Sequence, residues 1–326
     1  MAAGILTRDA QVGLAMAWHG KTYVEEKIDS SNCRINYAME IRPTYIQSGD
    51  KYLPANGRQI VSSDDGLPVG KIVGKDYKLF SNSDIWEAVA GSLSGTTHQI
   101  VSCGTVNDRS LGFVSVKISE DFKAANRLTS SVLNVIWGHG GNKAVVARSG
   151  FTVIVCQNTL HLAEREQADF KASERHTTNG SLVNLSKAID NHVGVTAEFK
   201  SAMDELHSVD VVASRAEKIY AGFLCGDKMP ETKTGYSRVS NVVDSMVNLF
   251  TSGKGNSGRT MADVLNGATD YYSHASSGGR DNSWKQFVSS EFGSGNIAKS
   301  RFLEVLCDPY ALKGVEKVGE TFLQNA

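Results

Sequence analysis

Lysines, arginines and tyrosines lie close together in two short segments of the first quarter of the chain. Proteins that bind single-stranded nucleic acid without sequence preference combine cations, which contact phosphates, with aromatic rings on which bases stack. These residue types therefore indicate a nucleic-acid-binding surface. The residues we expect on it are Arg34, Tyr37, Lys71, Lys75, Tyr77 and Lys78.

The same lysines and rings also fit a purely structural role. Tyr77 and Phe80 have the size and polarity of core residues, and lysines on an edge strand discourage strand-to-strand aggregation. On that alternative the lysines only solvate the strand. The two interpretations differ in whether the tyrosine rings and the cations share one wet surface.

A second candidate for chemistry lies in the middle of the chain, where Cys156 and His161 have the types of a nucleophile and a base. Cys156 closes the apolar run that begins at Phe151, and a cysteine in such a place is usually a small buried hydrophobe. Asn158 and Thr159 follow it, and both residue types cap helix N-termini. The pattern thus also fits a strand that passes into a helix.

Other catalytic patterns have little support. No H-x-x-x-H, H-E-x-x-H or paired cysteine motif is present, so we expect no zinc site and no other cofactor. Gly253-Lys-Gly-Asn-Ser-Gly258-Arg-Thr260 resembles a P-loop with arginine in place of lysine. A working P-loop follows a buried strand, whereas residues 239–250 read as a helix. We therefore expect a polar linker between helices.

The first half of the sequence has the pattern of strands. Alternation over residues 34–42 predicts a half-buried strand, which Pro43 ends or confines to a sheet edge. Gly49-Asp50 and Asn56-Gly57 are turn signals. A helix capped by Ser81 or Ser83 is expected to present Ile85, Trp86, Val89 and Leu93 to the core. Further strands are expected at residues 59–61, 71–80, 98–106, 111–118, 131–137, 143–148 and 151–155, with a turn at Lys75-Asp76 inside the second of them.

The second half has the three- and four-residue periodicity of amphipathic helices. We expect them at residues 182–206, 210–224, 237–250, 261–275 and 297–306. The fold class is therefore α+β. A β-rich domain, residues 1–165, forms a curved antiparallel sheet with one or more helices. A helical region, residues 166–326, packs on that sheet, so that both form one continuous unit.

Composition limits the classes of function. The chain has 326 residues, with 34 Lys and Arg against 35 Asp and Glu, so any nucleic-acid surface must be a local patch. Five scattered cysteines suit a reducing compartment. Neither a secretory leader nor an apolar run of membrane-spanning length is evident. We therefore expect a soluble protein of the cytoplasm, with no membrane partner.

The order of several motifs resembles the phage/plasmid-like family of unknown function, which is found on bacteriophages and conjugative plasmids. The segments that carry the resemblance are Trp18-His19-Gly20, Val73-Gly-Lys75-Asp-Tyr77, Val155-Cys156-Gln-Asn158-Thr159-Leu160, His176-Thr177 and Asn266-Gly-Ala-Thr-Asp270-Tyr271-Tyr-Ser-His274. In the family an arginine precedes the cysteine–x–asparagine–threonine stretch. This chain has Thr152 or Val153 there, and its nearest arginine is Arg148.

The resemblance implies a mobile genetic element and a β-rich half followed by helices, with no settled activity. More loosely, that pattern is similar to the single-strand annealing proteins of phage recombination and to the eukaryotic recombination mediator, which assemble into rings on single-stranded DNA. The expected function is therefore a phage-encoded, non-enzymatic, oligomeric protein that binds or anneals single-stranded DNA in recombination or replication. The alternatives are a factor that binds and inhibits or redirects a host protein, and an enzyme built around Cys156, Asn158 and His161.

Overall fold

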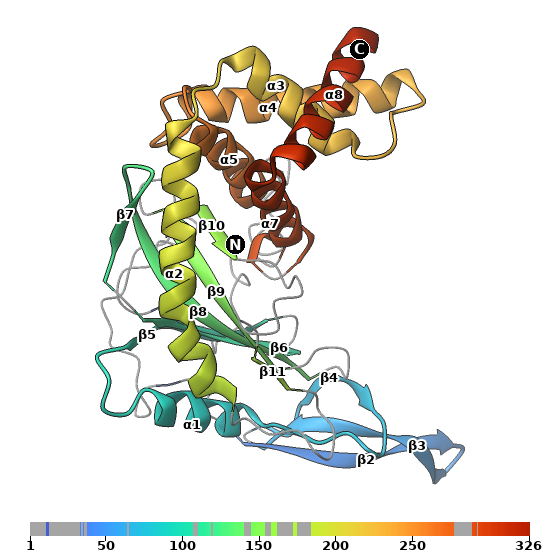
Figure 1. The fold of residues 1–326 in the computed structure, drawn as a ribbon. Coiled ribbons are helices and arrows are strands. Elements are labelled where there is room, and N and C mark those ends of the chain that lie inside the picture. The colour runs from blue at the N-terminus through green and yellow to red at the C-terminus, as the bar shows by residue number, and fades with distance from the viewer. Residues whose placement is uncertain are drawn as a thin grey trace. The chain divides into compact units, whose positions relative to one another are not determined.

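The protein has an α+β fold, with strands in its N-terminal half and helices mainly in its C-terminal half, as the sequence predicts (Figure 1). The computed structural model describes residues 11–12, 33, 35, 38–63, 65–106, 110–118, 120–139, 145–153, 158–161, 172–174, 184–276, 289–291 and 293–326. Its contacts define two compact units. Unit 1 comprises residues 1–120, 131–149 and 166–195, and unit 2 comprises residues 121–130, 150–165 and 196–326.

The larger sheet has eight strands in the described part of the chain, and every strand pair with a recorded register is antiparallel. Its strands are β1 (Gln11–Val12), β5 (Gln99–Val106), β6 (Leu111–Lys117), β7 (Phe122–Ala124), β8 (Arg127–Gly138), β9 (Val145–Val153), β10 (Asn158–His161) and β11 (Ala172–Glu174). The path runs β1-β5-β6-β8-β9-β10, with β11 beside β9 and β7 beside β8. Strands expected near residues 98–106, 111–118 and 131–137 are confirmed.

Helix α1 (Asn82–Ser92) packs its apolar face into the core of unit 1. Ser81 caps it, and Asp84 closes a capping box by accepting a bond from the Ser81 backbone N–H. Trp86 and Val89 lie in one buried cluster with Trp137 of β8. The helix predicted at this place, its Ser81 cap and its inward face are therefore confirmed.

A second sheet in unit 1 contains β2 (Met39–Ser48), β3 (Lys51–Ser62) and β4 (Pro68–Val73) in that order. Strand β2 does not end at Pro43. It continues through an irregularity between Pro43 and Tyr45 and turns at Gly49, which has φ +60°. Because β2 lies at a sheet edge in the described structure, the proline is tolerated. Asn56-Gly57 lies inside β3 at that irregularity, so the turn predicted there is wrong.

The C-terminal half is helical, as its periodicity predicts. Its elements are α2 (Asn184–Ser208), α3 (Ala213–Cys225), α4 (Lys233–Ser252), α5 (Met261–Asp270), the π-helix η1 (Tyr271–Ala275), α7 (Ser294–Cys307) and α8 (Pro309–Asn325). Helix α8, which begins at the Asp308 cap with proline in its first turn, is additional to the helices expected from sequence. In unit 2, the largest helix–helix contact that involves it is with α3.

Glycines make the close approach of α3 and α8 possible. A Cβ atom at Gly319 would overlap the carbonyl oxygen of Lys218, and one at Gly222 would overlap that of Val315. Gly314, also on α8, has open space at the same position. The helix backbones therefore touch at Gly222 and Gly319, whereas Gly314 takes no part in this contact.

The segment after Cys156 departs from the expected helix start. Asn158–His161 is strand β10, antiparallel to β9, with Asn158 opposite Val153 and His161 opposite Gly150. Pairing with a neighbouring strand satisfies the backbone groups that a helix cap would otherwise satisfy. Within the residues that the structure describes, the first helix after this point is α2, from Asn184.

The two units interleave along the chain. Strands β8 and β9 and helix α2 each begin in one unit and continue into the other. Among the helices that the structure describes, none is both long and apolar enough to cross a membrane.

Candidate functional site

The loop between β4 and α1, residues 74–80, holds three of the predicted nucleic-acid-binding residues. Strand β4 ends at Val73 and a turn follows at Lys75-Asp76, as expected, but the strand positions expected beyond that turn are not strand. The Arg58 guanidinium of β3 donates to the backbone carbonyls of Gly74 (2.9 Å) and Lys75. This anchoring fixes the loop, on which the side chains of Lys75 and Lys78 are exposed.

Tyr77 points toward the protein and not toward solvent. It is half-buried against the apolar cluster of the small sheet, and its hydroxyl donates to the Gly138 carbonyl at 3.4 Å. Burial raises the pKa of Tyr77 well above its ordinary value. The Lys78 ammonium lies 5.2 Å from the centre of the Phe80 ring, within the range of a cation–π contact. Tyr77 thus positions the loop more than it offers a face to a base.

The remaining predicted binding residues are described only in part. Lys71 belongs to β4, the strand that leads into the loop. Arg34 and Tyr37 lie outside the described residues. The structure therefore brings Lys75 and Lys78 to one loop beside β4.

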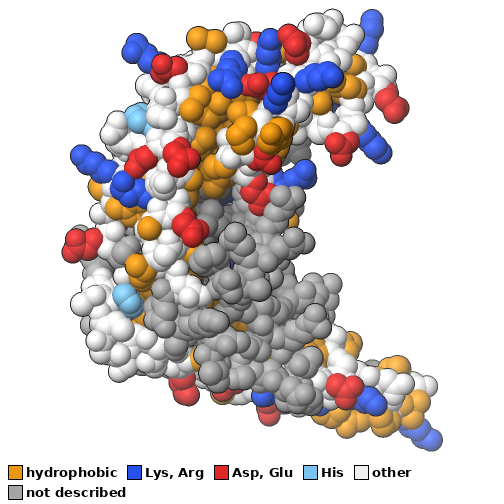
Figure 2. Space-filling model, viewed as in Figure 1, with side chains coloured by type: hydrophobic (Ala, Val, Ile, Leu, Met, Phe, Trp, Pro, Cys, Tyr) orange, Lys and Arg blue, Asp and Glu red, His pale blue; other side chains and the backbone are white. Residues whose placement is uncertain are grey.

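The outer part of the β2–β3 hairpin, residues 43–54, carries an exposed apolar surface that sequence reasoning missed. We call it the outer arm. Tyr45 and Tyr52 are 56% and 69% exposed, and Ile46 and Leu53 are 61% and 51% exposed. Figure 2 shows hydrophobic side chains gathered along the end of this hairpin. The Gly49-Asp50 turn, with apolar residues on both sides, is the sequence signal that could have found it.

The family motif around Cys156 is split between described and undescribed residues. Asn158 and Thr159 form β10, whereas Trp18, His19, Cys156 and His176 lie outside the described part. Thr152 of β9 is opposite Thr159. Arg148 is half-buried, and burial lowers the pKa of its guanidinium.

The last family segment, residues 266–274, spans the end of α5 and the π-helix η1. Lys299 of α7 is completely buried close by, and its ammonium donates to Ser290 (2.9 Å) and Ser273 (3.3 Å) and lies 3.8 Å from Glu291. Burial lowers the pKa of Lys299, although Glu291 opposes that shift. π-Helical turns and buried lysines are both frequent at functional sites. Here the hydroxyls and the carboxylate solvate the ammonium, which is a structural arrangement.

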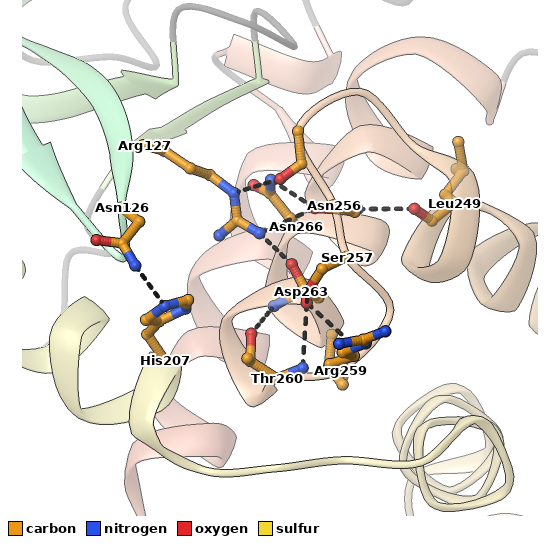
Figure 3. Close-up of polar contacts among 12 residues, drawn as sticks. Asn126, Arg127, His207, Leu249, Asn256, Ser257, Arg259, Thr260, Asp263 and Asn266 are labelled. Atoms are coloured by element: carbon orange, nitrogen blue, oxygen red, sulfur yellow. Dashed lines mark hydrogen bonds and ion pairs between the residues drawn. The ribbon is translucent and has the colours of Figure 1, made fainter.

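A buried ion pair organises the loop between α4 and α5 in unit 2 (Figure 3). Arg127 of β8 donates to a carboxylate oxygen of Asp263 and, through Nε, to the Gly255 carbonyl at 2.9 Å. The other oxygen of Asp263 accepts from the Ser257 hydroxyl at 2.7 Å and from the backbone N–H of Arg259 at 3.0 Å. Both side chains of the ion pair are less than 10% exposed.

This geometry explains the P-loop-like sequence. Residues 253–260 follow helix α4 and not a strand, so the predicted polar linker between helices is confirmed. The backbone N–H groups of Arg259 and Thr260 donate to Asp263. Burial raises the pKa of Asp263, but the Ser257 hydroxyl, the two N–H groups and Arg127 outweigh it and hold the pKa below its ordinary value.

Unit 1 contains one further pair of side chains, a serine and a histidine, of the kinds that serve in catalysis. The Ser149 hydroxyl and Nδ1 of His192 are 2.7 Å apart, and both side chains are buried. Burial, aided by His98, lowers the pKa of His192 to about 4. The imidazole is therefore neutral near pH 7 and fully packed. Among the described residues, no group of three or more His, Cys, Asp or Glu side chains could hold a metal ion.

Comparison with known proteins places the chain in a family. A domain of unknown function (DUF932) matches residues 70–297, which is more than half of the chain. The chain belongs to the DUF932 family. The DUF932 match begins within β4 and includes the lysine loop, the larger sheet from β5 onward and helices as far as α7. The outer arm and α8 lie outside it. No curated protein and no solved structure matches the chain.

Proposed function

We propose that this protein binds single-stranded DNA, or anneals complementary strands, without catalysing a covalent reaction. The observation that carries the proposal is the loop of residues 74–80, in which Arg58 fixes the backbone and two neighbouring lysines are exposed. Ammonium groups on a fixed loop can contact phosphates without first losing backbone entropy. The resemblance to phage and plasmid proteins supports a setting in the recombination or replication of a mobile element.

The described surface favours binding through phosphates. On the face shown in Figure 2, cationic and acidic side chains are interleaved over the helices of unit 2, so this face is not a broad basic surface. Because Tyr77 packs against the small sheet, base stacking in this proposal falls to Tyr37, with Arg34 and Lys71 as further cations. Contacts of this kind are sequence-tolerant and weaken as salt rises.

Replacing both exposed lysines tests the proposal. We expect Lys75→Ala/Lys78→Ala to weaken binding of an oligo-dT by about tenfold at low salt, since two phosphate contacts are lost. The slope of log affinity against log salt should decrease by about 1.4, at about 0.7 per phosphate on a single strand. Fluorescence anisotropy of a labelled oligonucleotide measures both quantities. Annealing of complementary strands should slow in the same variant.

The matched control is Lys313→Ala/Lys317→Ala, which removes two exposed cations from α8 and changes net charge equally. It should bind like the unmodified protein. If both double variants bind equally, or if the unmodified protein binds no oligonucleotide at low salt, the proposal is wrong.

One observation favours the second candidate, a factor that binds a host protein. The outer arm is apolar and exposed, as protein-docking surfaces often are. Capture of one defined host protein in the presence of nuclease, together with no oligonucleotide binding, would favour this function over the first.

A further inference from the structure

The outer arm is a two-stranded ribbon with exposed apolar side chains on both faces. From the β2–β3 register, Tyr45 and Tyr52 share one face and Ile46 and Leu53 share the other. An isolated two-stranded hairpin is marginally stable in water. A monomer that exposes such a surface on both sides of a thin ribbon gains stability when another chain covers it.

The arm also has open strand edges within the described structure. Strand β4 pairs with β3 only through residues Arg58, Ile60 and Val61, so β3 has no described partner on that side along residues 51–57. Strand β2 is the edge of its sheet along its whole length. Exposed edges present unpaired N–H and C=O groups to another strand. The arm can therefore accept a partner at its edges as well as on its faces.

The charges of the outer arm indicate which kind of partner fits it. Residues 43–54 contain one acidic side chain, Asp50, and one basic side chain, Lys51. Nucleic acid requires an excess of cations, and an acidic or basic peptide would leave its own charges unpaired on this surface. A second copy of the same arm brings the same apolar residues and a balancing pair of opposite charges. The arm is thus complementary to itself in both charge and polarity.

We infer that two copies of this chain associate through their outer arms. The contact is isologous: the same residues serve on both sides, as in a two-fold homodimer. A face-to-face contact removes one apolar pair of each copy from water, either Tyr45 and Tyr52 or Ile46 and Leu53. This inference does not depend on DNA binding, because the lysine loop lies outside residues 43–54.

Sedimentation equilibrium of the full chain without nucleic acid tests the inference. The double variant Ile46→Lys/Tyr52→Lys places one charge on each face of the arm. Since both positions are solvent-exposed, we expect the monomer to fold, with an unchanged circular dichroism spectrum. Its dimer dissociation constant should rise at least about a hundredfold, because burying two unpaired ammonium groups opposes association.

The control variant, Leu67→Lys/Ile297→Lys, changes two equally exposed apolar residues outside the arm and should dimerise normally. A photo-crosslinking residue at position 52 should yield a covalent dimer joined within residues 43–54, whereas one at position 297 should not. A monomeric unmodified protein at about 100 μM, equal loss of association in both variants, or crosslinks that reach only other proteins would overturn the inference. Oligonucleotide binding by the monomeric arm variant would show that DNA binding does not require the contact between arms, so that failure of one proposal is not failure of the other.

Discussion

At the residue scale, several buried polar groups are paired with partners from distant parts of the chain. Arg127 and Asp263 are 136 positions apart, and no local pattern marks either as half of a buried ion pair. The same holds for Ser149 and His192, which are 43 positions apart. Sequence reasoning could find Ser81 and Asp84, because a capping box lies within four residues. It could not find pairs whose partners depend on the fold.

Removing Arg127 should destabilise the protein strongly. Arg127→Ala leaves the Asp263 carboxylate buried with hydrogen bonds but without its counter-charge, which typically costs about 3–5 kcal/mol. The free energy of unfolding in urea measures this cost. Arg238→Ala, at an exposed position of α4, should change stability by less than about 0.5 kcal/mol. Comparable small losses in both variants would show that the ion pair contributes little.

The Ser149–His192 pair predicts a pH dependence of stability. The folded pKa of His192 is about 4, below its ordinary value of 6.5, so the unfolded chain binds the proton more readily. Stability from this group is complete above about pH 6.5 and is lost as pH falls toward 4, by about 3 kcal/mol. His192→Asn keeps a polar partner for Ser149 and removes this titration. Denaturant unfolding from pH 7 to 4 should show a steeper loss in the unmodified protein, and parallel curves would contradict the assignment.

At the element scale, periodicity predicted the helices well because their apolar faces are encoded locally, as in α1 and α2. The strands expected at residues 98–106, 111–118 and 131–137 were also found, whereas the two expected at 143–148 and 151–155 are one strand, β9. The outer arm was missed because Pro43 signals a strand end, and only an edge position makes it acceptable. Strand β10 was missed because a cap and a strand compete for the same residues, and pairing with β9 decides between them.

The α3–α8 contact provides a test at this scale. The methyl group of Gly319→Ala would overlap the carbonyl oxygen of Lys218 and should force the two helices apart. We expect a loss of stability of about 1–3 kcal/mol, as for other overpacked contacts. Gly314→Ala on the same helix meets open space and should be neutral or stabilising by up to about 1 kcal/mol. Thermal unfolding of the two variants measures the difference. Equal melting temperatures would mean that the helices do not pack as closely as described.

At the scale of the whole molecule, composition and hydrophobic pattern were sufficient for the α+β class. They were insufficient for the binding surface, since 34 basic and 35 acidic residues give no overall field. The candidate site depends on which lysines the loop after β4 exposes and which rings the small sheet buries. Tyr77 shows the difference: its sequence position fits either role, and its contact with Gly138 favours positioning over stacking.

The interleaved units have a practical corollary for anyone who wants to dissect this protein. Residues of both units are present in β8, β9 and α2, and each unit is built from three separate stretches of the chain. A single cut in the backbone therefore leaves part of one unit on the same fragment as the other unit. Expressing the β-rich and helical halves as separate fragments would therefore give two incomplete cores. Point substitution within the intact chain is the way to assign a role to either part.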